Sequence, residues 1–173
     1  MKKFLIVALA LLAIFSTSLV ALGLNSPSVS KGAGVITGMF ATEDIGILLG
    51  LEYGLSEKFA VSGRVGLDDD FEYTKFVVKY GVSPTFALLG GVIEYGYDET
   101  DPYFGINGAV SFDRDFMGIL EAGVVLTDDD PEVIYEVGIK YKLNNQLDIR
   151  GGIMGSTHDG SDTAFELGAG FSF

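Results

Sequence analysis

The sequence contains no cysteine and no tryptophan, and it has only four prolines and one histidine. Without cysteine, the chain has no disulfide, no thiolate metal site, no cysteine nucleophile and no lipid anchor attached through sulfur. Basic residues are also scarce, since 11 Lys and Arg stand against 24 Asp and Glu and give a net charge of −13. Binding of nucleic acid requires clustered basic side chains on the phosphates, so nucleic acid is excluded as a partner.

Glycine and aromatic residues, by contrast, are abundant, with 24 Gly, 13 Phe and 8 Tyr in 173 residues. A high glycine content often accompanies disorder, but disordered chains are poor in aromatic and β-branched residues. The length is that of a single domain. The composition therefore predicts one folded domain rather than a flexible chain.

The beginning of the chain has the pattern of a targeting segment. Lys2 and Lys3 precede the apolar stretch Phe4–Phe15, and small residues follow it. This order is typical of a secretory signal peptide, and the apolar run is short for a spanning helix, which needs about 20 residues. We therefore predict a cleaved signal peptide at residues 1–23, a short tail at 24–31 and the folded domain at 32–173.

After the tail, apolar and polar residues alternate in segments of about ten residues that are separated by turn-forming residues. This length suits the tilted strands of a transmembrane barrel, which need about 9–11 residues. We predict ten strands, at residues 33–41, 45–55, 59–67, 73–82, 85–97, 103–112, 116–126, 133–143, 147–155 and 163–173. Eight strands remain possible if the first hairpin is irregular.

Alternation by itself does not say which face points inward. A soluble barrel places its apolar face inside, whereas a membrane barrel places it outside against lipid. Here the polar face is rich in glycine, which weakens a solvated strand but fits a crowded lumen. The apolar face carries too many large side chains for a narrow lumen, and aromatic residues gather near strand ends. We therefore predict an all-β, closed antiparallel up-and-down transmembrane barrel; a soluble periplasmic barrel with an apolar ligand is the alternative.

The inward face of this barrel is predicted to carry equal numbers of acids and bases. The predicted charge lattice consists of Glu52, Arg64, Lys75, Lys79, Glu94, Glu121, Glu136, Lys140, Lys142, Asp148, Arg150 and Glu166. A buried charge is costly unless it is paired. The balance predicts an ion-paired, largely filled lumen, and incomplete pairing would leave a narrow pore that favours cations.

The last strand resembles the signal that the barrel assembly machinery of the bacterial outer membrane reads. Its alternate apolar positions are Phe165, Leu167, Ala169, Phe171 and the terminal Phe173. In pattern and size the domain resembles the small outer-membrane barrels of the OmpA transmembrane-domain, OmpX and YfaZ type. This resemblance implies an outer-membrane location and a structural or interaction role. It implies outer-membrane lipid, lipopolysaccharide and the assembly machinery as partners, with the short turns in the periplasm.

The connections that this orientation places outside the cell are acidic and contain no Lys or Arg. Hard divalent cations such as Ca²⁺ and Mg²⁺ prefer carboxylate oxygens. Candidate ligands for a weak divalent cation are Asp68, Asp69, Asp70, Asp128, Asp129, Asp130 and Glu132. Neither cluster follows an EF-hand pattern, so no dedicated cofactor is expected, and the alternative is a set of solvated loops that keep the chain soluble during export.

Catalysis has one candidate segment, in which the single histidine, His158, is followed by Asp159 and Ser161. The segment loosely resembles the rim of outer-membrane proteases of the omptin type, which are much longer. Adjacent residues of an extended strand point in opposite directions, and nucleophilic catalysis needs a base within hydrogen-bond reach of the nucleophile. We predict no catalytic residue.

Overall fold

The computed structural model describes residues 27–28, 30–42, 46–67, 73–95, 100–128, 130–157 and 163–173. The described residues contain no helix that is long and apolar enough to cross a membrane. Residues 1–26 lie outside the described part of the chain, so the division into signal peptide, tail and domain stays a prediction.

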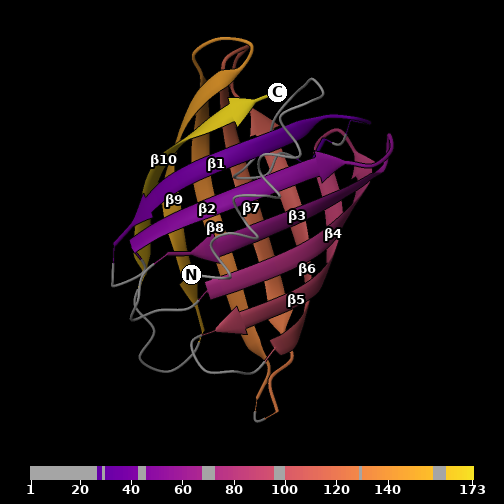
Figure 1. Ribbon diagram of the computed structural model, residues 1–173, viewed down its shortest axis with the longest axis vertical. Helices are drawn as coiled ribbons and strands as arrows, with labels where there is room; N and C mark the ends of the chain where they lie inside the picture. The colour runs from indigo at the N-terminus through magenta and orange to yellow at the C-terminus, as the bar shows by residue number, and fades with distance from the viewer. Residues whose placement is uncertain are drawn as a thin grey trace, which may run out of the picture.

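Ten antiparallel strands form a closed barrel, as the period-two pattern predicted (Figure 1). The strands are β1 (Gly34–Ala41), β2 (Gly46–Gly54), β3 (Phe59–Gly66), β4 (Tyr73–Ser83), β5 (Phe86–Tyr95), β6 (Thr100–Ser111), β7 (Phe116–Val125), β8 (Glu132–Lys142), β9 (Leu147–Ser156) and β10 (Ala164–Ser172). Each strand pairs with its neighbours in the chain, and β1 closes the barrel on β10. The all-β, up-and-down prediction is confirmed, and the eight-stranded alternative is wrong.

Short turns gather at one end of the barrel, which we call the turn end, and the longer connections lie at the other, the loop end. β1 begins and β10 ends at the turn end. In three of its turns a side-chain oxygen accepts hydrogen bonds from two backbone amides of the same turn. The acceptors are Ser56 Oγ, Asp113 Oδ1 and Asn144 Oδ1. Such local bonds favour a tight reversal over continued strand and so fix where the strands end.

Large apolar side chains point away from the barrel axis along the strands. Phe40, Phe104 and Leu167 are 70%, 58% and 64% exposed. A soluble barrel with an apolar interior requires the opposite arrangement. The exposed band therefore has the character of a lipid-facing surface.

Aromatic side chains border this band at the turn end. The rings of Phe59 and Tyr80 have centroids 5.1 Å apart, and those of Phe112 and Phe116 are 5.4 Å apart. Tilted aromatic pairs at these distances are favourable, and aromatic girdles are typical of the membrane interface of such barrels.

Strand β5 differs from the sequence prediction in which of its faces points inward. Pairing with β4 places Leu89 opposite the buried Lys79, and it places Glu94 opposite the exposed Thr74. Glu94 therefore lies on the outward face, and its predicted place in the lumen is wrong. The segment from Ala87 to Ile93 is apolar or glycine on both faces, so its alternation does not define an inside. The ladder to β4 decides instead.

Candidate functional site in the barrel lumen

Apolar side chains fill the lumen in the loop-end halves of the strands. This apolar layer consists of Met39, Leu48, Tyr73, Ile93, Tyr103, Val125, Ile134, Met154 and Ala164. Each of them is at most 8% exposed. Buried apolar side chains exclude water from the space they occupy. This layer was not predicted from the sequence. The alternation does place Ile134 on the inward face, since it lies two residues before Glu136 in β8.

Two ion pairs next to this layer cross the lumen from one wall to the other. In the strand ladders Arg64 lies directly opposite Lys75, and Glu121 lies directly opposite Glu136. Like charges in directly opposed positions repel. Arg64 instead forms a bidentate pair with Glu136, with N–O distances of 2.8 and 3.1 Å, and Lys75 donates a hydrogen bond to Glu121. We call these the cross-lumen pairs.

The cross-lumen pairs join strands on opposite sides of the barrel. β3 and β4 lie in the near wall in Figure 1, whereas β7 and β8 lie in the far wall. The side chains of Arg64 and Glu136 are only 11% and 8% exposed, and those of Lys75 and Glu121 are 9% each. A charge-assisted, bidentate arginine–carboxylate pair has fixed geometry, so it holds the two walls at a defined separation.

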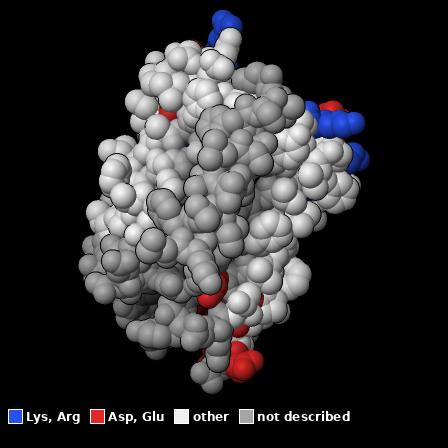
Figure 2. Space-filling model, viewed as in Figure 1, with Lys and Arg blue, Asp and Glu red and all other residues white. Residues whose placement is uncertain are grey.

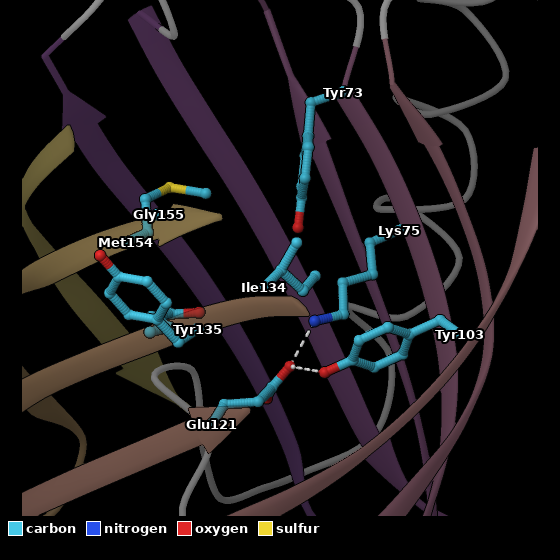
Figure 3. A pocket seen from close by; sticks show the side chains of 9 residues that line it. Tyr73, Lys75, Tyr103, Glu121, Ile134, Tyr135, Met154 and Gly155 are labelled. Carbon is cyan, nitrogen blue, oxygen red and sulfur yellow. Dashed lines mark hydrogen bonds and ion pairs between the residues drawn. The ribbon is translucent and has the colours of Figure 1, made fainter. Parts of the chain in front are cut away.

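Tyr103 completes the Lys75–Glu121 pair. Its hydroxyl lies 3.2 Å from Glu121 Oε1, and its ring centroid lies 4.1 Å from Lys75 Nζ. Figure 3 shows Lys75 and Tyr103 directed at the same carboxylate, with Ile134 beside them. The cavity at this place has a volume of about 20 Å³, which is the space of one water molecule. The lumen around Lys75, Tyr103 and Glu121 is therefore tightly packed.

In the turn-end half, the ion pairs lie within one strand or join strands that are neighbours or next neighbours. Lys79 Nζ lies 2.7 Å from Glu52 Oε2. Asp148 binds Arg150, with 2.8 Å from Nη2 to Oδ2, and it lies 3.2 Å from Lys140 Nζ. Beyond them a cavity of about 280 Å³ lies at the turn end; its lining includes Arg114, Lys140, Lys142 and Asp148. We call this cavity the vestibule.

Glu166 differs from the other lumen carboxylates, because neither of its oxygens has a hydrogen-bond partner among the described residues. It is 4% exposed. It adds a third acid to Glu121 and Glu136, which face the two bases Arg64 and Lys75. Arg150 Nη1 and Asn107 Oδ1 are also buried without a partner in this part of the chain. A buried polar group without a partner costs free energy, so we expect these three positions to lower the stability of the barrel.

Most of the predicted lumen residues do point inward. The buried or nearly buried members are Glu52, Arg64, Lys75, Lys79, Glu121, Glu136, Lys140, Asp148, Arg150 and Glu166. Lys142 shares their face of β8, but it is exposed because it is the last residue of the strand and borders the vestibule. Glu94 lies outside the barrel, as described above. What the equal numbers of acids and bases did not reveal is which residues pair.

The residues of the predicted assembly signal lie on β10 and at its end. Phe165, Leu167, Ala169 and Phe171 are exposed on the outer face. The ring of Phe173 closes over Gly34 of β1, where a Cβ would lie 2.9 Å from it. Recognition by the assembly machinery remains a prediction that this geometry permits.

Most of the predicted cation ligands fall outside the described residues, namely Asp68, Asp69, Asp70 and Asp129, and so does the segment His158–Ser161. Asp128 and Asp130 are exposed at the loop end, and Glu132 is partly exposed. The described part of the chain contains no group of three or more acids or histidines placed to hold a metal ion. In Figure 2, the visible blue bases lie toward the upper, turn end together with some red acids, and further red acids lie at the lower, loop end. The cation site therefore stays a prediction.

Comparison with known proteins gives a family. A family model for the outer membrane protein beta-barrel domain matches residues 6–173. No curated protein matches the sequence.

Several solved structures are similar to the chain at low identity. The N-terminal β-barrel domain of Pseudomonas aeruginosa OprF is 13% identical, with 83% of this chain and 98% of that chain covered and a TM-score of 0.43. The Yersinia pestis outer membrane protein Ail is 15% identical, with 83% and 100% covered and a TM-score of 0.42. The KdgM porin is 13% identical, with 80% and 99% covered and a TM-score of 0.46.

Proposed function

Because the chain belongs to the outer membrane protein β-barrel domain family, we propose that it is a non-conducting barrel with a structural or interaction role in the cell envelope. The single observation that carries this proposal is that two ion pairs, Arg64–Glu136 and Lys75–Glu121, cross the lumen next to the apolar layer. Its location is the outer membrane, and we propose that a cleaved signal peptide takes it there. The family model describes an outer-membrane barrel domain, which supports a role without catalysis.

A closed lumen is supported by the energetics of the cross-lumen pairs. Removing one partner of a buried ion pair costs about 3–5 kcal/mol, because it leaves an uncompensated charge in a poorly solvated place. Opening the lumen between β3 and β8 would break the Arg64–Glu136 pair and expose the apolar layer at the same time. Ions in transit would have to offset both costs.

The acidic loop end supports an interaction role at the cell surface. With the turn end in the periplasm, the carboxylates face the phosphate groups of lipopolysaccharide. Carboxylates and phosphates repel unless a divalent cation bridges them, and Ca²⁺ and Mg²⁺ bind oxygen ligands of both kinds. We propose that such ions join single loop carboxylates to phosphates of neighbouring lipopolysaccharide, and Asp128, Asp130 and Glu132 are candidates for separate bridges of this kind within the described residues.

Planar-bilayer recording tests the closed lumen. The wild-type barrel is expected to give no conductance steps, and the double variant Arg64→Ala, Glu136→Ala is expected to give them. Lys142→Ala is the matched control, since Lys142 is exposed at the vestibule and lies in neither cross-lumen pair. Steady, cation-selective steps from the wild type would overturn the proposal and favour a narrow pore whose acidic rim draws cations.

Thermal unfolding tests the cation bridge. Addition of Ca²⁺ at about 1 mM, a level at which weak oxygen-ligand sites bind, is expected to raise the melting temperature of the purified barrel. The increase should shrink in the variant Asp128→Asn, Asp130→Asn and persist in Asp115→Asn, which removes an exposed acid at the turn end. An unchanged melting temperature of the wild type would remove the cation bridge and leave solvated acidic loops.

A further inference from the structure

The residues just before β1 reverse the direction of the chain at the turn end of the barrel. Ala33 N donates a hydrogen bond of 3.1 Å to Ser30 O, and Gly32 has a φ of 77° between them. A bond from the fourth to the first residue with a positive φ at the third position is the signature of a type II turn, which favours glycine there. The chain before Gly32 therefore does not continue away from the barrel along β1.

The turn is fastened to the last residue of β2. Gly32 N donates to Gly54 O at 2.8 Å, and Gly54 N donates to Ala33 O at 2.7 Å. Gly54 lies on the inward face of β2, two residues beyond the buried Glu52, and a Cβ on it would collide with the carbonyl of Ser30. Because a Cβ at this position points toward the lumen, Ser30 lies on the lumen side of the barrel wall.

Burial at this side of the turn end agrees with a covering segment. Ala60 is 1% exposed and Lys79 is 0% exposed. Ala60 is the ladder partner of Gly54, and Lys79 is the ladder partner of Ala60. On the opposite side of the same end, Lys142 borders the vestibule and is exposed. The mouth is therefore covered over β2–β4 and open near β8.

We propose that residues 30–33 are a built-in stopper that is seated on Gly54 and shields the Glu52–Lys79 pair from the solvent at the turn end. The stopper covers one side of the turn-end half, whereas the cross-lumen pairs lie in the loop-end half, so this inference does not depend on a non-conducting barrel. The seat requires glycine at two places: at Gly32 for the turn and at Gly54 for the approach of Ser30.

Cysteine labelling tests the stopper, because the sequence contains no cysteine that would add a background signal. The Ala60→Cys variant, purified from outer membranes, reports access beneath the stopper, and Lys142→Cys reports access at the vestibule. A small charged thiol reagent is expected to label Ala60→Cys slowly and Lys142→Cys fast. Adding Gly54→Val should speed labelling of Ala60→Cys on the order of tenfold. The stopper would then be displaced permanently, and labelling would no longer wait for a rare local opening. Labelling of Lys142→Cys should not change.

A second background separates loss of the seat from damage to β2. Gly32→Val strains only the turn, because its φ of 77° is unfavourable for a β-branched residue, and it is expected to have the same effect as Gly54→Val. Heat-modifiable migration in gels verifies that each variant is folded. Equal labelling rates of Ala60→Cys in all folded backgrounds would overturn the stopper, and so would fast labelling of Ala60→Cys by itself. This experiment measures thiol labelling and not conductance. A result that overturns the stopper would therefore not bear on the proposed non-conducting barrel.

Discussion

The two halves of the lumen are closed by contacts of different reach. In the loop-end half, Arg64 pairs with Glu136 and Lys75 pairs with Glu121, across 72 and 46 residues of chain. In the turn-end half the separations are 27 residues for Glu52 and Lys79, and two for Asp148 and Arg150. The long-range pairs join opposite walls and form only when the barrel has closed. The turn-end pairs need only one strand, as for Asp148 and Arg150 on β9, or two next-neighbouring strands, as for Glu52 and Lys79. The comparison indicates that the loop-end half defines the cross-section of the barrel.

The largest expected effect comes from breaking a long-range pair. Glu136→Ala leaves the guanidinium of Arg64 buried without its partner, and we expect it to lower the free energy of unfolding by about 3–5 kcal/mol. The measurement is the urea midpoint of unfolding from lipid vesicles. Lys142→Ala, at the exposed end of the same strand, should change stability by less than about 0.5 kcal/mol. Equal losses of unfolding free energy in the two variants would mean that the Arg64–Glu136 pair does not stabilise the barrel.

The next effect concerns the outer wall around the loop-end half. Leu167 is 64% exposed on β10, next to the inward Glu166. Leu167→Arg places a charge against the acyl chains and is expected to cost about 2–4 kcal/mol near the middle of the bilayer. Unfolding from vesicles measures it, with Leu167→Ala as the uncharged control. A harmless Leu167→Arg would contradict the assignment of this face to lipid.

A smaller effect of opposite sign is expected at Glu166. Among the described residues its buried carboxylate has no hydrogen-bond partner, and it lies in the same half as the acids Glu121 and Glu136 and the bases Arg64 and Lys75. Glu166→Gln removes the unpaired charge and keeps the shape, so we expect it to raise the free energy of unfolding by about 1–2 kcal/mol. Glu121→Gln is the matched control and should lower it, because that carboxylate binds Lys75 and Tyr103. Destabilisation by both variants would show that Glu166 has a partner.

The strands were predictable because period-two alternation survives in most of them. The seventh strand was predicted at residues 116–126 and is observed as Phe116–Val125, and the barrel closes with the predicted number of strands. Partner choice was not predictable, because a neutral set of acids and bases permits many pairings and the register of the closed barrel selects one. Apolar side chains of the lumen, such as Met154 and Ile134, were missed because hydrophobicity is the same signal on either face.

The smallest effect on the free energy of unfolding is expected in strand β5, where the alternation predicted the wrong inward face. Alternation placed Glu94 in the lumen, whereas the ladder places it outside, between Thr74 of β4 and Thr100 of β6. An outward carboxylate near the loop end, flanked by two threonines, lies where the lipid-facing band gives way to water. Glu94→Gln is therefore expected to change the free energy of unfolding by less than about 0.5 kcal/mol. A loss comparable to that of Glu136→Ala would return Glu94 to the lumen and reverse the faces of β5, since only a buried, paired carboxylate costs so much to neutralise.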